Sequence, residues 1–238
     1  MQPAATRAQA TSRDTITDVT SVRASATLPE SAVPRPRTWP LAAVLLPPAT
    51  AIVIGAVALL ILLTPPWMHL ALDLSGGSSG LATLQQAHEL SDQTVVELFA
   101  GPGTFAAFAA DEAGHMRDVR LVLWGFLGLA LASFAIVAWR LSRHGRSPQT
   151  WQAVARGGLL LVGVTVVVGL FATLAFGVAF ELFHRVFFPG GNWAFAQDSL
   201  LIRLYPYEFW QLTAGALGVL LIVGGVVVWW FARRRARE

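Results

Sequence analysis

The sequence predicts an all-α membrane protein. Four transmembrane helices form a bundle, and the loops between the first two and the last two helices form a small extracytoplasmic head. The composition is one reason, because 55% of the 238 residues are hydrophobic and 13% are charged, whereas soluble domains carry roughly 25% charged residues. A second reason is the presence of four uncharged stretches, each long enough to cross a bilayer as a helix, which needs about 20 residues. The third is the uneven distribution of arginine along the chain.

The membrane domain is predicted to extend over residues 39–232. Polar backbone groups in lipid have to be satisfied within their own segment, so we expect the apolar stretches to be helices. The predicted spans lie at about 41–63, 119–140, 157–182 and 208–231. The first span is too long for the core of a cleaved signal peptide, so we interpret it as an uncleaved signal anchor. The remaining segments of this domain are an outer head at 64–117 and an outer loop at 183–207.

The arginine distribution predicts the orientation. Residues 1–38 have no apolar periodicity, and we interpret them as a disordered cytoplasmic tail. This tail, the loop between the second and third spans, and the Arg-rich end at 233–238 hold 13 of the 17 basic residues, all of which are arginine. Arginine accumulates on the cytoplasmic side of membranes, so both termini are predicted to be cytoplasmic. The basic charge therefore reflects topology, and no nucleic-acid partner is expected.

The outer segments are long for so small a bundle. The head is predicted to contain a flexible stretch at 76–80 and a short helix that begins at Ser91 or Asp92 and ends at Phe99. In the second outer segment, Asp198 is expected to cap a short interfacial helix. Long loops on a rigid scaffold commonly carry function, so we expect the functional site at the outer face.

Ionisable residues gather where the second span begins and where the third span ends. Glu112, His115 and Asp118 follow one another at intervals of three residues and would share one face of a helix. Glu181 precedes His184 by the same spacing. A carboxylate beside a histidine fixes its tautomer and raises its basicity. The topology places both histidines at one level of the outer surface. We therefore interpret them as a functional pair rather than as side chains that extend to lipid headgroups.

The other three histidines have weaker claims to a function. His144 lies in the Arg-rich inner loop, where it is expected to be a solvated charge. His69 and His88 lie in the head without a helical partner pattern, and we expect them to be ordinary surface residues.

Residue types that are absent exclude several chemistries. The chain has no cysteine and no lysine, which excludes disulfides, a thiol nucleophile and a lysine Schiff base. Two Glu-x-x-His motifs in a four-helix protein are also typical of di-metal carboxylate bundles. Such bundles need a further glutamate from each remaining helix, and the first span has no acidic residue. We therefore expect no metal ion and no other cofactor, with a metal-dependent enzyme as the weaker alternative.

Both histidine segments resemble known motifs. The segment 112–120 reads Glu-Ala-Gly-His-Met-Arg-Asp-Val-Arg and resembles the Glu-x-x-His-Met-x-Asp-Val-basic motif of the lipoprotein intramolecular transacylase family. The segment 183–188 reads Phe-His-Arg-Val-Phe-Phe, and together with Trp193 and Tyr205 it is similar to that family's second signature. The resemblance implies a multi-pass protein of a bacterial cell membrane that acts on a lipoprotein or lipid in the outer leaflet.

The resemblance also implies a reaction. An acyl chain would move from the glycerol of a diacylglyceryl-cysteine to the α-amine of that cysteine, without a cofactor, and we expect the protein to be a monomer. His115 and His184 would transfer the protons, which suits an amine with a pKa of about 7.7–8. Which of them acts as the base stays open at this point. The residues expected to orient the histidines or to stabilise charge are Glu112, Asp118, Glu181, Arg117 and Arg185. The residues expected to bind the substrate are Trp193, Phe187, Phe188 and Tyr205. The alternative outside catalysis is an envelope scaffold or binding protein.

Overall fold

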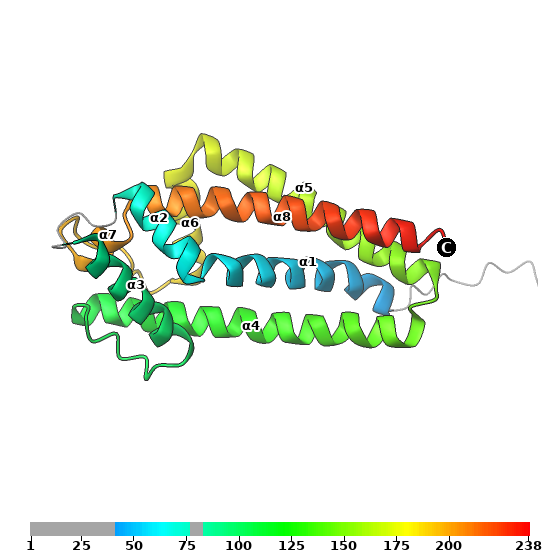
Figure 1. Ribbon diagram of the computed structural model, residues 1–238, viewed down its shortest axis with the longest axis horizontal. Coiled ribbons are helices and arrows are strands. Elements are labelled where there is room, and N and C mark those ends of the chain that lie inside the picture. The colour runs from blue at the N-terminus through cyan, green and yellow to red at the C-terminus, as the bar shows by residue number, and fades with distance from the viewer. Residues whose placement is uncertain (1–40, 77–82) are drawn as a thin grey trace, which may run out of the picture. The chain divides into compact units, whose positions relative to one another are not determined.

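The computed structural model describes residues 41–76 and 83–238, and the regular elements in these ranges are helices (Figure 1). In chain order they are α1 (Leu41–Leu62), α2 (Pro65–Ser75), α3 (Leu84–Phe99), α4 (Ala110–His144), α5 (Pro148–Leu174), α6 (Phe176–Phe187), α7 (Leu200–Leu204) and α8 (Tyr207–Arg235). Our predictions for the tail at 1–38 and for most of the flexible stretch at 76–80 lie outside the described residues.

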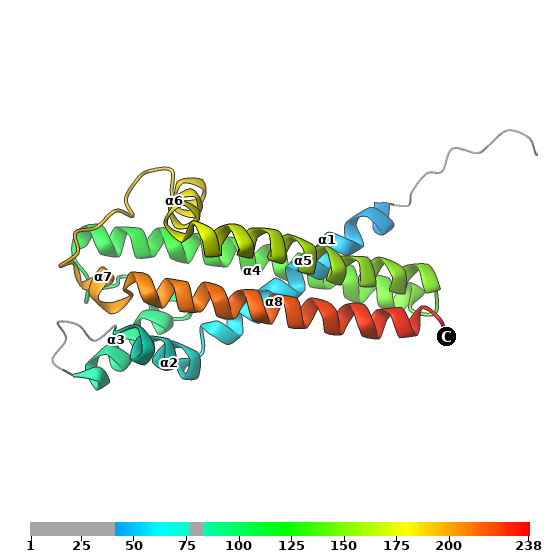
Figure 2. The same cartoon turned by 90° about the horizontal axis from the view of Figure 1, so that it is seen from above.

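Four of these helices, α1, α4, α5 and α8, are long and apolar enough to cross a membrane, which confirms the predicted all-α, four-span class. They run alongside one another: α5 packs against α1 and α8, and α1 also packs against α4 (Figures 1 and 2). Two of them begin earlier than the predicted spans. α4 starts at Ala110 and α5 at Pro148, because polar residues continue each helix beyond its apolar stretch.

The third apolar stretch does not form one helix over 157–182, as the sequence had suggested. α5 ends at Leu174, and Ala175 leaves the helical conformation with φ −146° and ψ 55° before α6 begins. α6 then crosses the direction of the long helices, so that it is seen end-on in Figure 2. The ring of Phe176 packs against the ring of Tyr207 in α8, with centroids 5.1 Å apart. This change of direction is what brings His184 towards α4.

Close packing of α5 depends on two glycines. A Cβ atom at Gly158 would lie 2.5 Å from the carbonyl oxygen of Gly225 in α8. A Cβ atom at Gly157 would lie 2.5 Å from the carbonyl oxygen of Pro47 in α1. Small residues are used in membrane helix interfaces because they allow such approaches between backbones. Since the obstacles here are backbone atoms, no side-chain rearrangement relieves them.

We expect Gly158→Val to destabilise the bundle, because the new side chain would separate α5 from α8. Overpacking of this kind typically costs about 1–3 kcal/mol. Gly163→Ala is the matched control, since a Cβ atom there meets nothing within 4 Å and alanine is the better helix former. Thermal unfolding of the purified variants in detergent measures both effects. A Gly158→Val protein that unfolds at the temperature of the wild type would contradict the close contact between these helices.

The head formed by α2, α3 and α7 has its own apolar core. The connection to α4 and the adjacent ends of α4 and α8 also contribute to this core. Its buried residues include Met68, Leu72, Leu98, Phe105, Phe108, Met116, Leu204 and Phe209. Tyr205 is also part of it. The Tyr205 hydroxyl donates to Ser91 Oγ at 3.3 Å, and burial raises the pKa of Tyr205 to about 12. The predicted interfacial helix is α7, although Ser199 rather than Asp198 caps it.

The helical hairpin of α2 and α3 is joined by the two head histidines. His69 pairs with Asp92 at 2.9 Å, and His88 pairs with Asp73 at 2.7 Å. The two imidazole rings also stack with centroids 4.1 Å apart. The structure corrects the expectation that they are ordinary surface residues, because each histidine has a carboxylate partner on the opposite helix. α3 begins earlier than the predicted helix but ends at Phe99 as predicted.

Candidate active site

Two buried histidines lie side by side at the end of the bundle next to the head. His115 is in the second turn of α4, and His184 is near the end of α6. Their ring centroids are 6.1 Å apart, and the side chains are only 6% and 8% exposed. The two histidines that the topology predicted to lie together are therefore adjacent in the structure. Two neutral imidazoles at this separation are able to act on one reacting group.

The hydrogen bonds of His184 define its tautomer. Its Nδ1 lies 2.7 Å from the carbonyl oxygen of Phe180. A carbonyl oxygen only accepts hydrogen bonds, so Nδ1 carries the proton and Nε2 keeps its lone pair. Burial lowers the pKa of His184 below its ordinary value of 6.5, and the bond to Phe180 opposes this shift in part. At neutral pH His184 is therefore an uncharged imidazole with a free basic nitrogen.

His115 has a different environment. Its Nδ1 atom is buried and has no hydrogen-bond partner among the described residues. A buried polar atom without a partner costs free energy and is rare in folded proteins. A ligand that hydrogen-bonds to this nitrogen would remove that cost.

Glu112 positions helix ends rather than an imidazole. Its side chain is 2% exposed. One carboxylate oxygen accepts the N–H of Ala109 at 2.8 Å, and the other accepts the N–H of Leu201 at 2.8 Å. Both donors belong to first turns, where backbone N–H groups have no partner within the helix. The carboxylate therefore joins the start of α4 to the start of α7, and His115 lies one turn beyond that junction.

The other charged residues predicted for the site are at its edge. Asp118 lies one turn beyond His115 on α4, where its negative charge would favour a protonated His115, and its carboxylate accepts a hydrogen bond from Asn192 Nδ2 at 2.6 Å. Glu181 was expected beside His184, but it pairs with Arg185 on the exposed side of α6. Arg117 is exposed on α4. Of these residues, only Asp118 has an interaction that involves a histidine of the pair.

Aromatic rings enclose the two imidazoles. Phe188 lies edge-on to His115, with centroids 4.7 Å apart, and Phe195 lies 5.7 Å from the same ring. Trp193 packs on His184 at 4.9 Å. Two of these residues, Phe188 and Trp193, were among the predicted substrate-binding residues.

The remaining predicted substrate-binding residues lie elsewhere. Tyr205 is buried in the head core, and Phe187 is half-exposed and contacts Phe183. Phe180, Phe195 and Asn192, which contact the histidines or Asp118, were not predicted from the sequence. The one signal for Phe195 was its position two residues after Trp193 in the loop between α6 and α7.

The alternative of a di-metal site does not fit the two Glu-x-x-His motifs as they lie here. Such a site requires both glutamates to face the metal ions together with the histidines. Glu112 instead accepts two backbone N–H groups, and Glu181 pairs with Arg185. Within residues 41–76 and 83–238, no three Asp, Glu or His side chains are arranged to hold a metal ion.

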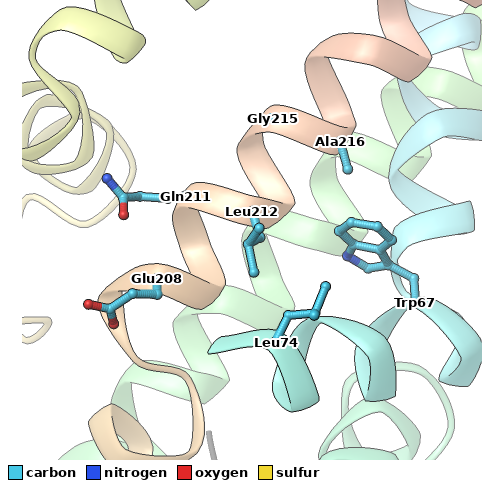
Figure 3. A pocket seen from close by; sticks show the side chains of 7 residues that line it. All are labelled: Trp67, Leu74, Glu208, Gln211, Leu212, Gly215 and Ala216. Carbon is cyan, nitrogen blue, oxygen red and sulfur yellow. The ribbon is translucent and has the colours of Figure 1, made fainter. Parts of the chain in front are cut away.

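A groove of about 590 Å³ lies between α2 and α8 (Figure 3). Its residues are Trp67, Leu74, Glu208, Gln211, Leu212, Gly215 and Ala216. This groove is lined by neither His115 nor His184, so it is not part of the histidine site.

Comparison with known proteins identifies the family of the chain. A family model described as "Lipoprotein intramolecular transacylase Lit" matches residues 84–210, slightly more than half of the chain, and this range contains both buried histidines. An uncharacterised protein of Aquifex aeolicus (strain VF5) is 29% identical over 123 residues. That match covers 51% of this chain, and the chain spans 55% of the length of the Aquifex protein.

Solved structures with the same fold also exist. The membrane integral lipoprotein intramolecular transacylase of Bacillus cereus matches with a TM-score of 0.73 at 18% identity, over 83% of this chain and 95% of that one. A histidine-to-alanine variant of that protein matches with a TM-score of 0.68 at 17% identity, over 83% of this chain and 93% of that one. At these identities the structures show that the fold is shared.

Proposed function

The chain belongs to the lipoprotein intramolecular transacylase family, and we propose that it moves an acyl chain within a diacylglyceryl-cysteine lipoprotein, from the glycerol to the cysteine α-amine. The observation that carries this proposal is the pair of buried imidazoles, 6.1 Å apart, within the stretch that the family model matches. The substrate holds both the attacking amine and the ester, so much of the cost of bringing them together is already met.

In this proposal His184 is the general base. Its Nε2 takes a proton from the α-amine as the amine nitrogen bonds to the ester carbonyl carbon. The bond between that carbon and the glycerol oxygen then breaks, and the proton passes to the departing oxygen. A lowered pKa keeps His184 in the neutral form that this role requires.

His115 is proposed to stabilise the oxyanion. Hydrogen-bond donors that are fixed in a water-poor site stabilise the charge that develops on a carbonyl oxygen. His115 is held in α4 next to the Glu112 junction, and in the tautomer with a proton on Nδ1 this nitrogen supplies an N–H donor that has no protein acceptor among the described residues. A substrate oxygen would be that acceptor.

The proposed orientation places the histidines at the outer face and both termini in the cytoplasm. α8 runs from Tyr207, which packs on α6, to the arginines 233–235 at the opposite end. The guanidinium of Arg234 lies 3.6 Å from the centre of the Trp230 ring. Aromatic and basic residues of this kind are typical of a cytoplasmic membrane interface.

We expect reporter fusions after Arg146 and after Glu238 to report a cytoplasmic location, and a fusion near Gly80 to report the outside. The reason is that arginine-rich segments stay on the cytoplasmic side during insertion. An enzyme reporter and a fluorescent reporter are active on opposite sides of the membrane. When both are fused at each position, each reporter is the control for the other. An outside signal at Arg146 would contradict the orientation and the proposed location of the site.

The function is tested by mass spectrometry of lipoprotein N-termini from cells with and without this protein. The expected product is a cysteine with an N-linked acyl chain and a glycerol with a single acyl chain. Without the protein, the cysteine amine should be free and the glycerol should carry two acyl chains. Lipoprotein N-termini that do not differ between cells with and without the protein would contradict the proposal.

A further inference from the structure

A short segment of irregular backbone covers the paired histidines. Residues 189–198 are exposed with two exceptions, Trp193 and Phe195. The indole of Trp193 lies 4.9 Å from His184, and the ring of Phe195 lies 5.7 Å from His115. We call Trp193 and Phe195 the roof, because each covers one imidazole, and we call residues 189–198 the roof segment.

Hydrogen bonds hold the roof segment to both histidine-bearing helices. Before it, the N–H of Phe188 donates to the carbonyl oxygen of His184 at 2.7 Å. In its middle, Asn192 donates to Asp118 of α4 at 2.6 Å. After it, the N–H of Leu201 donates to Glu112 at 2.8 Å. These contacts position the roof relative to both imidazoles.

The roof is relevant to which molecule accepts the acyl chain, the cysteine amine or water. Two imidazoles that activate an ester for attack by an amine also activate it for attack by water. In hydrolysis, the water oxygen bonds to the carbonyl carbon, the bond to the glycerol oxygen breaks, and a proton from water ends on that oxygen. The products are a free fatty acid and a lipoprotein with one acyl chain fewer. An enclosed site suppresses this side reaction by keeping water away.

We propose that Trp193 and Phe195 determine the acceptor: they exclude water from the imidazole pair, so that the acyl chain passes to the cysteine amine rather than to water. This inference rests on the acyl-transfer function proposed above. Its support is that the imidazoles are 6% and 8% exposed although the segment above them is largely exposed. The two rings that point inward from this segment account for part of that burial.

In the test, purified full-length protein acts on a synthetic diacylglyceryl-cysteine lipopeptide in detergent micelles. The amounts of the transfer product and of the hydrolysis product are then compared. Transfer leaves the mass of the lipopeptide unchanged, whereas hydrolysis lowers it by one acyl chain and releases fatty acid. For Phe195→Ala and Trp193→Ala we expect the ratio of hydrolysis to transfer to rise about tenfold, which corresponds to about 1.4 kcal/mol between the two barriers. Asn192→Ala should raise the ratio less. Phe134→Ala, which removes an exposed phenylalanine from α4, is the matched control and should leave the ratio unchanged.

The possible outcomes distinguish a failure of this inference from a failure of the proposed acyl-transfer function. If the wild type forms no N-acylated product, the proposed function is wrong. If the wild type transfers and the roof variants slow down without more hydrolysis relative to transfer, the roof does not choose the acceptor and the inference is overturned. Loss of both reactions in the roof variants overturns it as well, because the rings would then be needed for the reaction itself.

Discussion

Replacement of His184 by alanine is expected to lower the rate of N-acylation by about 10²–10⁴-fold, the usual contribution of a general acid–base group. The variant loses the free Nε2 that is proposed to accept the amine proton. His115→Ala is expected to have an effect of similar size, because it removes the proposed stabilisation of the oxyanion. Product formation from a diacylglyceryl-cysteine lipopeptide measures both rates.

Two further variants separate the chemistry of His184 from its structural role. His184→Asn keeps an N–H donor near the position of Nδ1, so it should preserve the contact with the Phe180 carbonyl while lacking a base. We therefore expect a folded but inactive protein. His144→Ala, at the end of α4 far along the helix from His115, should keep the wild-type rate. Stably inserted alanine variants of His115 and His184 that keep wild-type rates would contradict the assignment.

Glu112→Ala is expected to have the largest effect on stability. Its buried carboxylate accepts the N–H groups of Ala109 and Leu201, and both donors would be left without their partner. Hydrogen bonds to a charged group contribute roughly 1.5–3 kcal/mol each, so we expect a loss of about 3 kcal/mol or more. The start of α7 and the downstream end of the roof segment would also lose their attachment, so activity should fall as well.

Thermal unfolding in detergent and hydrogen exchange at the Leu201 amide measure this effect. Glu112→Gln should be intermediate, because the amide keeps one accepting oxygen but turns an N–H donor towards another donor. Glu89→Gln is the matched control, since Glu89 is exposed on α3. Unchanged stability and unchanged protection of Leu201 in Glu112→Ala would show that the junction of α4 and α7 does not depend on this carboxylate.

The membrane helices could be predicted because hydrophobicity over about 20 residues is a local property of the sequence. The break at Ala175 could not, because it interrupts an apolar run without a proline or a charge. The backbone turns there as Phe176 packs on Tyr207, a contact between residues far apart in the chain. Similarly, nothing in the spacing of Glu112 and His115 indicates that the carboxylate binds a backbone N–H at Leu201.

The histidine pair followed from topology alone, since the membrane gives both helix ends the same height. The environment of the pair followed only in part. Phe188 and Trp193 were expected from the family resemblance, whereas Phe195 lies in irregular backbone, where no sustained helical or strand period indicates which side chains point inward. The pairing of His69 with Asp92 was missed for a related reason, because it joins two helices rather than two positions on one helix face.

The central claim is that the acyl chain moves within one substrate molecule at the histidine pair. The most direct measurement is a crossover experiment with purified protein and equal amounts of two diacylglyceryl-cysteine lipopeptides. One carries isotope labels in both its acyl chains and its peptide, and the other is unlabelled. The account predicts N-acylated products of only the two parental masses, with fragmentation placing the acyl chain on the cysteine nitrogen, and product formation about 10²–10⁴-fold slower with His184→Ala. N-acylated products of mixed label would show that the acyl chain leaves its own substrate, and they would contradict the account.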